Sequence, residues 1–389
     1  MTRVQEAEVS GPIGRAIRVA ALSAGAVGAA GLAVLARSTD WFASLGARAT
    51  GERLERMRRS PRWSAERRRF VNAMPTHTML AGDAARSLRL QVAGKEMRYP
   101  VRPIPVEARR GADFETPPAS GLRATWLGHA AALVEVDGAR ILTDPVWSQR
   151  VSPSSLVGPR RFFEPPIALA DLPRVDAVVI SHDHYDHLDM DTVKELAKTA
   201  TRFIVPLGVG AHLERWGIPP PQIDERDWGE ASEVAGVTIT ATPARHFSGR
   251  RLNDRDATLW CSWVIAGPRH RVFYSGDSGY FDGYREIGRD HGPFDLTLMS
   301  LGAYGPTWPL IHMTPEEIVQ AQRDLGSGLL LPVHWATFNL AFHAWNEPVL
   351  RLAADARERG VRLTIPRPGE MVEPATLDDA KSAEWWTEP

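Results

Sequence analysis

The sequence predicts an α/β protein built from two packed β-sheets that are covered by helices. Many short apolar runs follow one another along the body of the chain, as expected of strands. Few helix-like stretches lie between them, which argues against a doubly wound single sheet. The 389 residues include 43% hydrophobic and 24% charged residues, close to globular averages. This composition excludes a wholly disordered, collagen-like or polytopic membrane protein.

The chain begins with a candidate membrane segment. Residues 19–36 are uncharged, follow Arg15 and Arg18, and are closed by Arg37. As a helix these residues would span about 27 Å, near the ~30 Å thickness of bilayer hydrocarbon. A secretory signal cleaved after Ala36 is the rival interpretation. We therefore assign residues 1–46 as a hydrophobic N-terminal anchor or signal.

An arginine-rich extension and linker, residues 47–120, follows. From Arg48 to Arg69 the chain has nine arginines and three glutamates. Positive charge beside a hydrophobic segment tends to stay in the cytoplasm, so a membrane-associated protein on the cytoplasmic face is favoured over an exported one. The arginines would attract anionic headgroups. The alternative is a solvated helical face paired with its own glutamates.

Residues 121–374 are the expected main domain, and 375–389 are a tail. Strands are expected at 124–128, 132–136, 139–144, 176–181, 202–206, 237–242, 259–265, 271–276, 296–302 and 329–333. Helices are expected at 190–198, 314–325 and 347–359. Thr314, Pro315 and the two glutamates after them are typical of a helix start, because hydroxyl caps and acidic side chains stabilise the positive end of the helix dipole.

Charge and cysteine content exclude several classes. The 46 basic and 47 acidic residues give a net charge of −1, so nucleic acid is not an expected partner. Cys261 is the only cysteine, which rules out an internal disulfide and a cysteine-rich zinc knuckle.

The segment 181–187, with the sequence SHDHYDH, directly follows the expected strand 176–180. Three imidazoles and two carboxylates so close together would be costly to bury as core, so they are expected in a polar site at a strand end. Imidazole and carboxylate suit zinc, our default, and also iron or manganese. His246, Asp277 and His334 each follow another expected strand. Alone, each would be an ordinary polar or turn residue.

The HxHxDH pattern, followed in order by His246, Asp277 and His334, resembles the metallo-β-lactamase superfamily. The resemblance implies a four-layer αββα sandwich with two zinc ions. It places His182, His184 and His246 on one ion, Asp186, His187 and His334 on the other, and Asp277 between them. Asp144 matches the superfamily's first motif and is expected to orient ligands rather than to bind metal. Asp183 is left free to orient a ligand or the water.

Further motifs resemble the N-acylphosphatidylethanolamine-hydrolysing phospholipase D family across roughly residues 121–370. They are TWLGHA at 125–130, LTDPVW at 142–147, SPS at 152–154, GPRRF at 158–162, GAY at 302–304, His312 with PEE at 315–317, and HWATF at 334–338. This family implies hydrolysis of membrane phospholipids to phosphatidic acid by a water shared between two metal ions. Asp186 and His312 are the expected catalytic residues, with His312 contacting phosphate or the leaving oxygen. A helix-start role for His312 is the alternative.

Partners expected on this basis are a phospholipid substrate and the membrane surface, with a homodimer left open. A lactonase or amide metallohydrolase would use the same metal frame, and so would an iron oxygenase. A non-catalytic membrane-bound metal protein is the alternative of another class. The complete ligand set counts against it.

Overall fold

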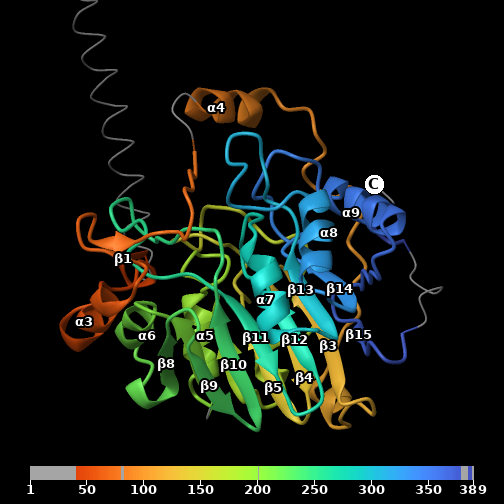
Figure 1. Ribbon diagram of the computed structural model, residues 1–389. Coiled ribbons are helices and arrows are strands. Elements are labelled where there is room, and N and C mark those ends of the chain that lie inside the picture. Colours follow the sequence, from red (N-terminus) through yellow and green to blue (C-terminus); the bar gives the residue numbers. More distant parts are fainter. Residues whose placement is uncertain (1–40, 80–82, 200, 378–383, 388–389) are drawn as a thin grey trace, which may run out of the picture.

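The computed structural model describes residues 41–79, 83–199, 201–377 and 384–387, which form two facing β-sheets flanked by helices (Figure 1). The first sheet has the strand order β15-β3-β4-β5-β6-β7-β8. These strands are β3 (Leu122–Gly128), β4 (Ala131–Val136), β5 (Ala139–Thr143), β6 (Ala177–Val179), β7 (Arg202–Pro206), β8 (Ile223–Arg226) and β15 (Met371–Val372).

The second sheet has the order β14-β13-β12-β11-β10-β9. Its strands are β9 (Ala231–Val234), β10 (Val237–Thr242), β11 (Ser262–Ala266), β12 (Arg271–Tyr274), β13 (Leu296–Ser300) and β14 (Leu329–Val333). In each sheet an antiparallel half adjoins a parallel half, the latter formed by β5 to β8 and by β12 to β14. Parallel strands point their carboxyl ends to the same edge, which brings the loops that follow them together.

Helices cover the outer face of both sheets. Helices α5 (Met190–Leu196) and α6 (Gly210–Arg215) pack their buried side chains on the first sheet. Helices α7 (Gly283–His291), α8 (Pro315–Asp324) and α9 (Glu347–Glu358) lie over the second (Figure 1). Short 3-10 turns occur at Gly111–Phe114, Leu169–Asp171 and Pro220–Gln222. The expected four-layer αββα sandwich is confirmed.

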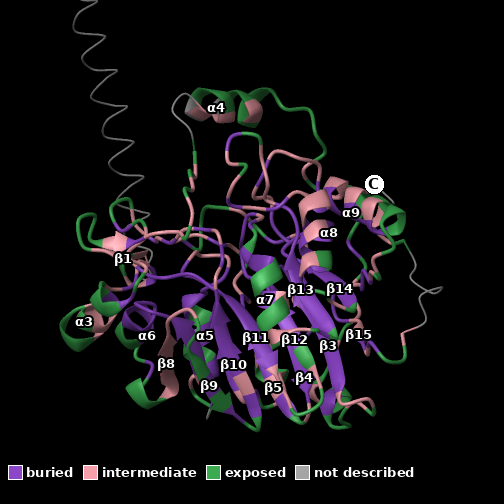
Figure 2. Cartoon of the chain, viewed as in Figure 1, coloured by how far each residue is buried: buried purple, intermediate pink, exposed green. Residues whose placement is uncertain are grey.

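Strand periodicity explains why the layers stay together. In β3, Trp126 joins the cluster between the sheets, whereas its neighbour Leu127 joins the cluster beneath α5 and α6. Val134 and Leu133 divide in the same way in β4. Successive side chains of a strand point to opposite faces, so a strand covered on both sides must be apolar throughout. All of β3 and β4 is buried, and Figure 2 shows burial concentrated in the sheets.

All ten expected strands and all three expected helices are present, with Thr314 capping α8 by accepting a hydrogen bond from the Glu317 amide. The strands β8 and β9 were not expected. Their sequences, IDER and ASEV, are polar because β8 and β9 are edge strands, where charged side chains are favoured. Helix α7 was missed because its sequence has only a few apolar positions.

The arginine-rich extension is docked on the body. It contains α2 (Trp41–Ser44), α3 (Gly51–Arg59), a hairpin of β1 (Trp63–Ser64) and β2 (Arg69–Phe70), and the exposed α4 (Asp83–Ala93). Met57 and Phe70 pack against Leu207, Leu259 and Trp260 of the catalytic body. Arg53 forms ion pairs with Glu214 at 2.8 Å and Glu225 at 2.6 Å. This part of the extension is therefore one body with the sandwich.

The expected anchor or signal at 19–36 lies outside the described residues. Within the ranges that the structure does describe, none of the helices combines the length and the apolar character needed to cross a bilayer.

Candidate metal centre

The expected site residues meet at one edge of the sandwich, each on a loop that leaves a strand. The motif 181–187 follows β6, His246 follows β10, Asp277 follows β12 and His334 follows β14. Tight turns make this possible. Gly276 has a φ of +51°, and a Cβ there would lie 2.4 Å from the Ser181 Cβ. Asp144 and His334 also have positive φ, of 29° and 67°, which costs roughly 1–2 kcal/mol each for a non-glycine residue.

Three imidazole nitrogens form the first half of the centre. His184 Nδ1 lies 2.8 Å from His182 Nε2 and 3.4 Å from His246 Nε2. Burial, reinforced by neighbouring imidazoles, lowers the pKa of His182 well below its usual range, and burial also lowers the pKa of His246 and His184. These rings are therefore neutral, which is the form of imidazole that binds metal.

The second half contains Asp186, His187 and His334. Asp186 Oδ2 lies 3.5 Å from His187 Nε2 and 3.4 Å from His334 Nε2. Asp277 stands between the halves. Its Oδ2 lies 3.1 Å from His187 Nε2 and 3.9 Å from His182 Nε2, and its Oδ1 lies 3.3 Å from His334 Nε2. The seven expected ligands thus form two neighbouring groups that share Asp277.

Unpaired buried atoms show that this constellation fits cations. Among the described residues, His187 Nε2, His334 Nε2 and Asp277 Oδ1 are buried without a hydrogen-bond partner of suitable geometry. Such atoms cost roughly 1–3 kcal/mol each when left uncompensated. The three atoms converge on one point, where a divalent ion would compensate them. A metal cofactor is therefore supported by both the donor set and its burial.

Asp144 holds this arrangement from behind, as the sequence predicted for it. The carboxylate is fully buried and accepts hydrogen bonds from the Ser181 amide at 2.7 Å, the Ser181 hydroxyl at 2.5 Å and the Tyr274 hydroxyl. His187 Nδ1 donates to it at 2.6 Å. Since Nδ1 holds the proton, Nε2 presents its lone pair to the centre. His246 is fixed likewise, by donating from Nδ1 to the Ile311 carbonyl at 2.9 Å.

Asp183 contacts none of the expected ligands. Its carboxylate accepts hydrogen bonds from His212 Nε2 at 3.2 Å, the Gly249 amide at 2.7 Å and the Thr258 hydroxyl at 3.0 Å. Burial alone would raise the pKa of Asp183, but these donors hold it below its usual range. His212 in turn accepts a hydrogen bond from the Ala47 amide. Asp183 thus ties α6 and the loop 249–258 to the motif and orients no water at the centre.

His312 lies at the margin of the centre. Its Nδ1 is 4.0 Å from Asp277 Oδ2, and its ring centroid is 5.1 Å from that of His246. Burial lowers the pKa of His312 to about 4, so the ring is neutral at physiological pH. A neutral imidazole offers one N–H donor.

His129, at the end of β3, belongs to the centre although sequence reasoning gave it no role. Its Nε2 lies 3.1 Å from Asp186 Oδ2, and its ring centroid is 4.0 Å from that of His334. Burial lowers the pKa of His129 to about 3, so it donates to Asp186 as a neutral ring. The available signal was its position immediately after a strand, which it shares with the expected ligands.

A cavity of about 480 Å³ opens over the centre. Its polar floor is formed by five residues, His184, Asp186, Asp277, His312 and His334. Its walls are apolar except for Thr78 and Arg255, and include Met79, Phe247, Trp308, Ile311 and Leu340. Because Thr78 and Met79 belong to the extension, that segment completes the wall.

Comparison with known proteins agrees with this geometry. A family model described as the beta-lactamase superfamily domain matches residues 139–335. An uncharacterized protein of Mycobacterium tuberculosis is 52% identical over 299 residues, 76% of this chain and 79% of that protein. The N-acyl-phosphatidylethanolamine-hydrolyzing phospholipase D 1 of Caenorhabditis elegans is 37% identical over 270 residues, 66% of this chain and 75% of that protein. Igni18, a metallo hydrolase of Ignicoccus hospitalis, shares the fold with a TM-score of 0.51 at 24% identity, over 64% of this chain and 97% of that chain.

Proposed function

This chain belongs to the metallo-β-lactamase superfamily and is a metal-dependent hydrolase similar to N-acylphosphatidylethanolamine-hydrolysing phospholipase D, and from this premise we propose that it cleaves a phosphodiester bond of membrane phospholipids. The products are phosphatidic acid and the free headgroup, as from an N-acylphosphatidylethanolamine-like lipid. The observation that supports this most is the cavity, which joins a floor of metal-binding side chains to apolar walls. A phospholipid offers a charged phosphate and acyl chains to those two surfaces.

Two zinc ions are the proposed cofactors. His182, His184 and His246 would hold one, Asp186, His187 and His334 the other, and Asp277 would bind both. When bound, the ions neutralise the phosphodiester charge and lower the pKa of the attacking water.

The remaining steps belong to side chains of this protein. Asp186 lines the cavity and accepts a hydrogen bond from the attacking water, which sets the direction of attack. His129 holds the Asp186 carboxylate from behind through Nε2. His312 donates its one N–H to a phosphoryl or leaving oxygen, where negative charge grows during the reaction. The apolar walls exclude bulk water, which strengthens each of these contacts.

We also propose where the protein works. The substrate lies in a membrane, so the protein is expected at a membrane surface, with the cytoplasmic face favoured by the arginines that follow the segment 19–36.

Product analysis tests the reaction. Purified metal-loaded protein is incubated with vesicles that contain N-acylphosphatidylethanolamine, and lipids are identified by mass spectrometry. Phosphatidic acid and intact N-acylethanolamine are the expected products, and His184→Ala should yield neither. Release of fatty acid, or faster turnover of simple lactones than of any phospholipid, would contradict the assignment and favour a lactonase or amide hydrolase.

A further inference from the structure

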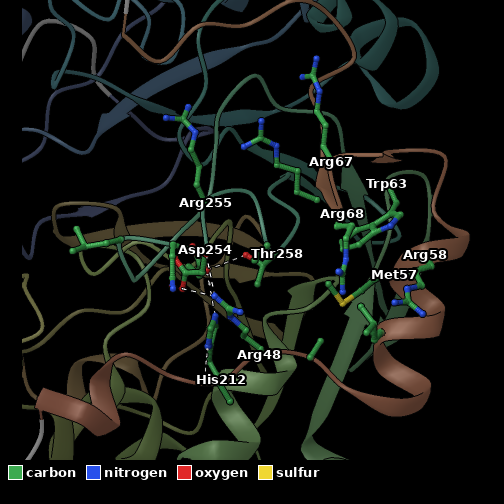
Figure 3. A pocket seen from close by; sticks show the side chains of 18 residues that line it. Arg48, Met57, Arg58, Trp63, Arg67, Arg68, His212, Asp254, Arg255 and Thr258 are labelled. Atoms are coloured by element: carbon green, nitrogen blue, oxygen red, sulfur yellow. Dashed lines mark hydrogen bonds and ion pairs between the residues drawn. The ribbon is translucent and has the colours of Figure 1, made fainter. Parts of the chain in front are cut away.

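A second cavity, apart from the one over the metal centre, lies between the extension and the loop 249–258. Its volume is about 590 Å³. Figure 3 shows arginine side chains reaching it from both walls, with Arg58, Arg67 and Arg68 from the extension and Arg255 from the loop. Arg48 and Arg69 complete the lining arginines. We refer to it as the arginine cavity.

The arginine cavity has a strong excess of positive charge. Its lining contains six arginines and two carboxylates, Asp183 and Asp254, a surplus of four positive charges. Both carboxylates are occupied within the protein. Asp183 accepts the three hydrogen bonds described above, and Asp254 Oδ1 accepts from the Arg250 amide at 3.1 Å and the Arg251 amide at 2.8 Å. The lining acids therefore compensate the arginines only in part.

Two of the arginines have no protein anion to bind. Across the residues that the structure describes, neither the Arg67 nor the Arg68 guanidinium makes a hydrogen bond or an ion pair. Arg68 also occupies the turn between β1 and β2 with a φ of +53°. Glycine would adopt this backbone without the roughly 1–2 kcal/mol that an L side chain costs there. The chain thus places an unpaired cation at a turn position that favours glycine.

An apolar side chain stands at the rim of the arginine cavity. Leu252 lines it and is fully exposed to solvent. A single exposed leucine has no cost that demands explanation, but beside unpaired arginines it forms the pattern of a membrane-interface contact, with cations for headgroups and an apolar tip for the acyl region. Free phosphate would use the arginines and leave Leu252 without a role.

Arg255 connects this cavity with the metal centre, since it lines both. Its guanidinium donates to the Thr78 hydroxyl and lies 5.1 Å from the centroid of the Phe247 ring. Phe247 in turn packs against the ring of His184, with centroids 4.4 Å apart. A lipid headgroup in the arginine cavity would therefore lie next to the opening of the catalytic cavity.

We propose that the arginine cavity binds the phosphate of an anionic phospholipid that is not the substrate, and that this contact holds the catalytic cavity against an anionic membrane. Guanidinium groups suit this ligand because their paired N–H donors match two phosphate oxygens. The site is independent of catalysis, so it stands or fails separately from the proposed reaction.

Vesicle binding by full-length, metal-loaded protein tests the site. Affinity is compared for phosphatidylcholine vesicles with and without phosphatidylglycerol. The variant Arg67→Gln/Arg68→Gln should lose about 30-fold in affinity for the anionic vesicles, from two contacts of about five- to sixfold each. Affinity for pure phosphatidylcholine should not change. The matched control Arg59→Gln/Arg89→Gln removes the same charge from exposed positions outside the cavity and should lose much less.

Three further results decide the matter. Equal losses in the two double variants would overturn the proposal, because diffuse surface charge would then account for binding. Leu252→Ser, at a fully exposed position that folding does not need, should weaken vesicle binding and leave binding of inorganic phosphate unchanged. Calorimetric binding of inorganic phosphate that is lost in Arg67→Gln/Arg68→Gln, with vesicle binding unaffected, would assign the cavity to soluble phosphate and contradict the lipid.

Discussion

Replacing Asp144 by asparagine should remove one metal ion through a change in the protonation of His187. In the native protein Asp144 Oδ1 accepts from the Ser181 amide, and Oδ2 accepts from His187 Nδ1 at 2.6 Å and from two hydroxyls. An asparagine keeps one acceptor oxygen, which the Ser181 amide requires. Its NH₂ group then faces His187 Nδ1. The hydroxyls can rotate to accept, but Nδ1 must give up its proton, which moves to Nε2.

A protonated Nε2 cannot bind a metal ion, so the defect should be confined to the half of the centre that contains His187. Loss of such an orienting partner typically costs 10–100-fold in metal affinity, or about 1.4–2.7 kcal/mol. Competition with a chromophoric chelator, with metal content measured by mass spectrometry, gives both affinities. One weakened and one unchanged ion is expected for Asp144→Asn, whereas Asp324→Asn, which removes only a contact to Arg285 and Tyr280, should keep both. Two unchanged ions in Asp144→Asn would refute the reasoning.

Four further predictions follow from the same geometry. His184→Ala should lose at least one metal ion and most activity, and retention of two ions would remove His184 from the ligand set. His312→Ala should reduce phosphodiester cleavage by roughly 10²-fold, as expected for one transition-state donor, while full metal content is kept; an unchanged rate would leave His312 only a helix-start role. Deletion of residues 1–40, which precede every described contact, should release the protein from membranes at high salt with the centre intact, and continued association would locate the anchor elsewhere. Metal-free protein should lose stability as the pH falls from about 6.5 to about 4, because burial lowers the pKa of His129 to about 3 and of His312 to about 4 and the unfolded chain therefore takes up protons first; a pH-independent melting temperature would contradict this.

The sandwich could be predicted from sequence because its core strands are apolar on both faces. Runs such as 132–136 and 329–333 are strands wherever they are buried between layers. Strands at the edges follow another rule. IDER in β8 and ASEV in β9 are polar because one side of each is open to solvent, so a hydrophobic pattern cannot identify them.

The candidate site could be predicted where residues cluster in the sequence or follow strands in a family's order. His129 was missed because it is a lone histidine, and only the fold brings it to Asp186. The direction of Asp183 was not predictable either, since motif spacing does not tell which side chains turn toward the centre. Its partners Gly249 and Thr258 lie more than sixty residues away along the chain.

The central claim is that the paired ligand groups hold two ions that act together. Metal-free protein titrated with zinc, with activity followed on N-acylphosphatidylethanolamine vesicles, tests it most directly. Activity should rise to a plateau at two zinc ions per chain and remain low at one. A plateau at one ion per chain, with no gain from the second, would contradict the shared role of Asp277 and with it the binuclear centre.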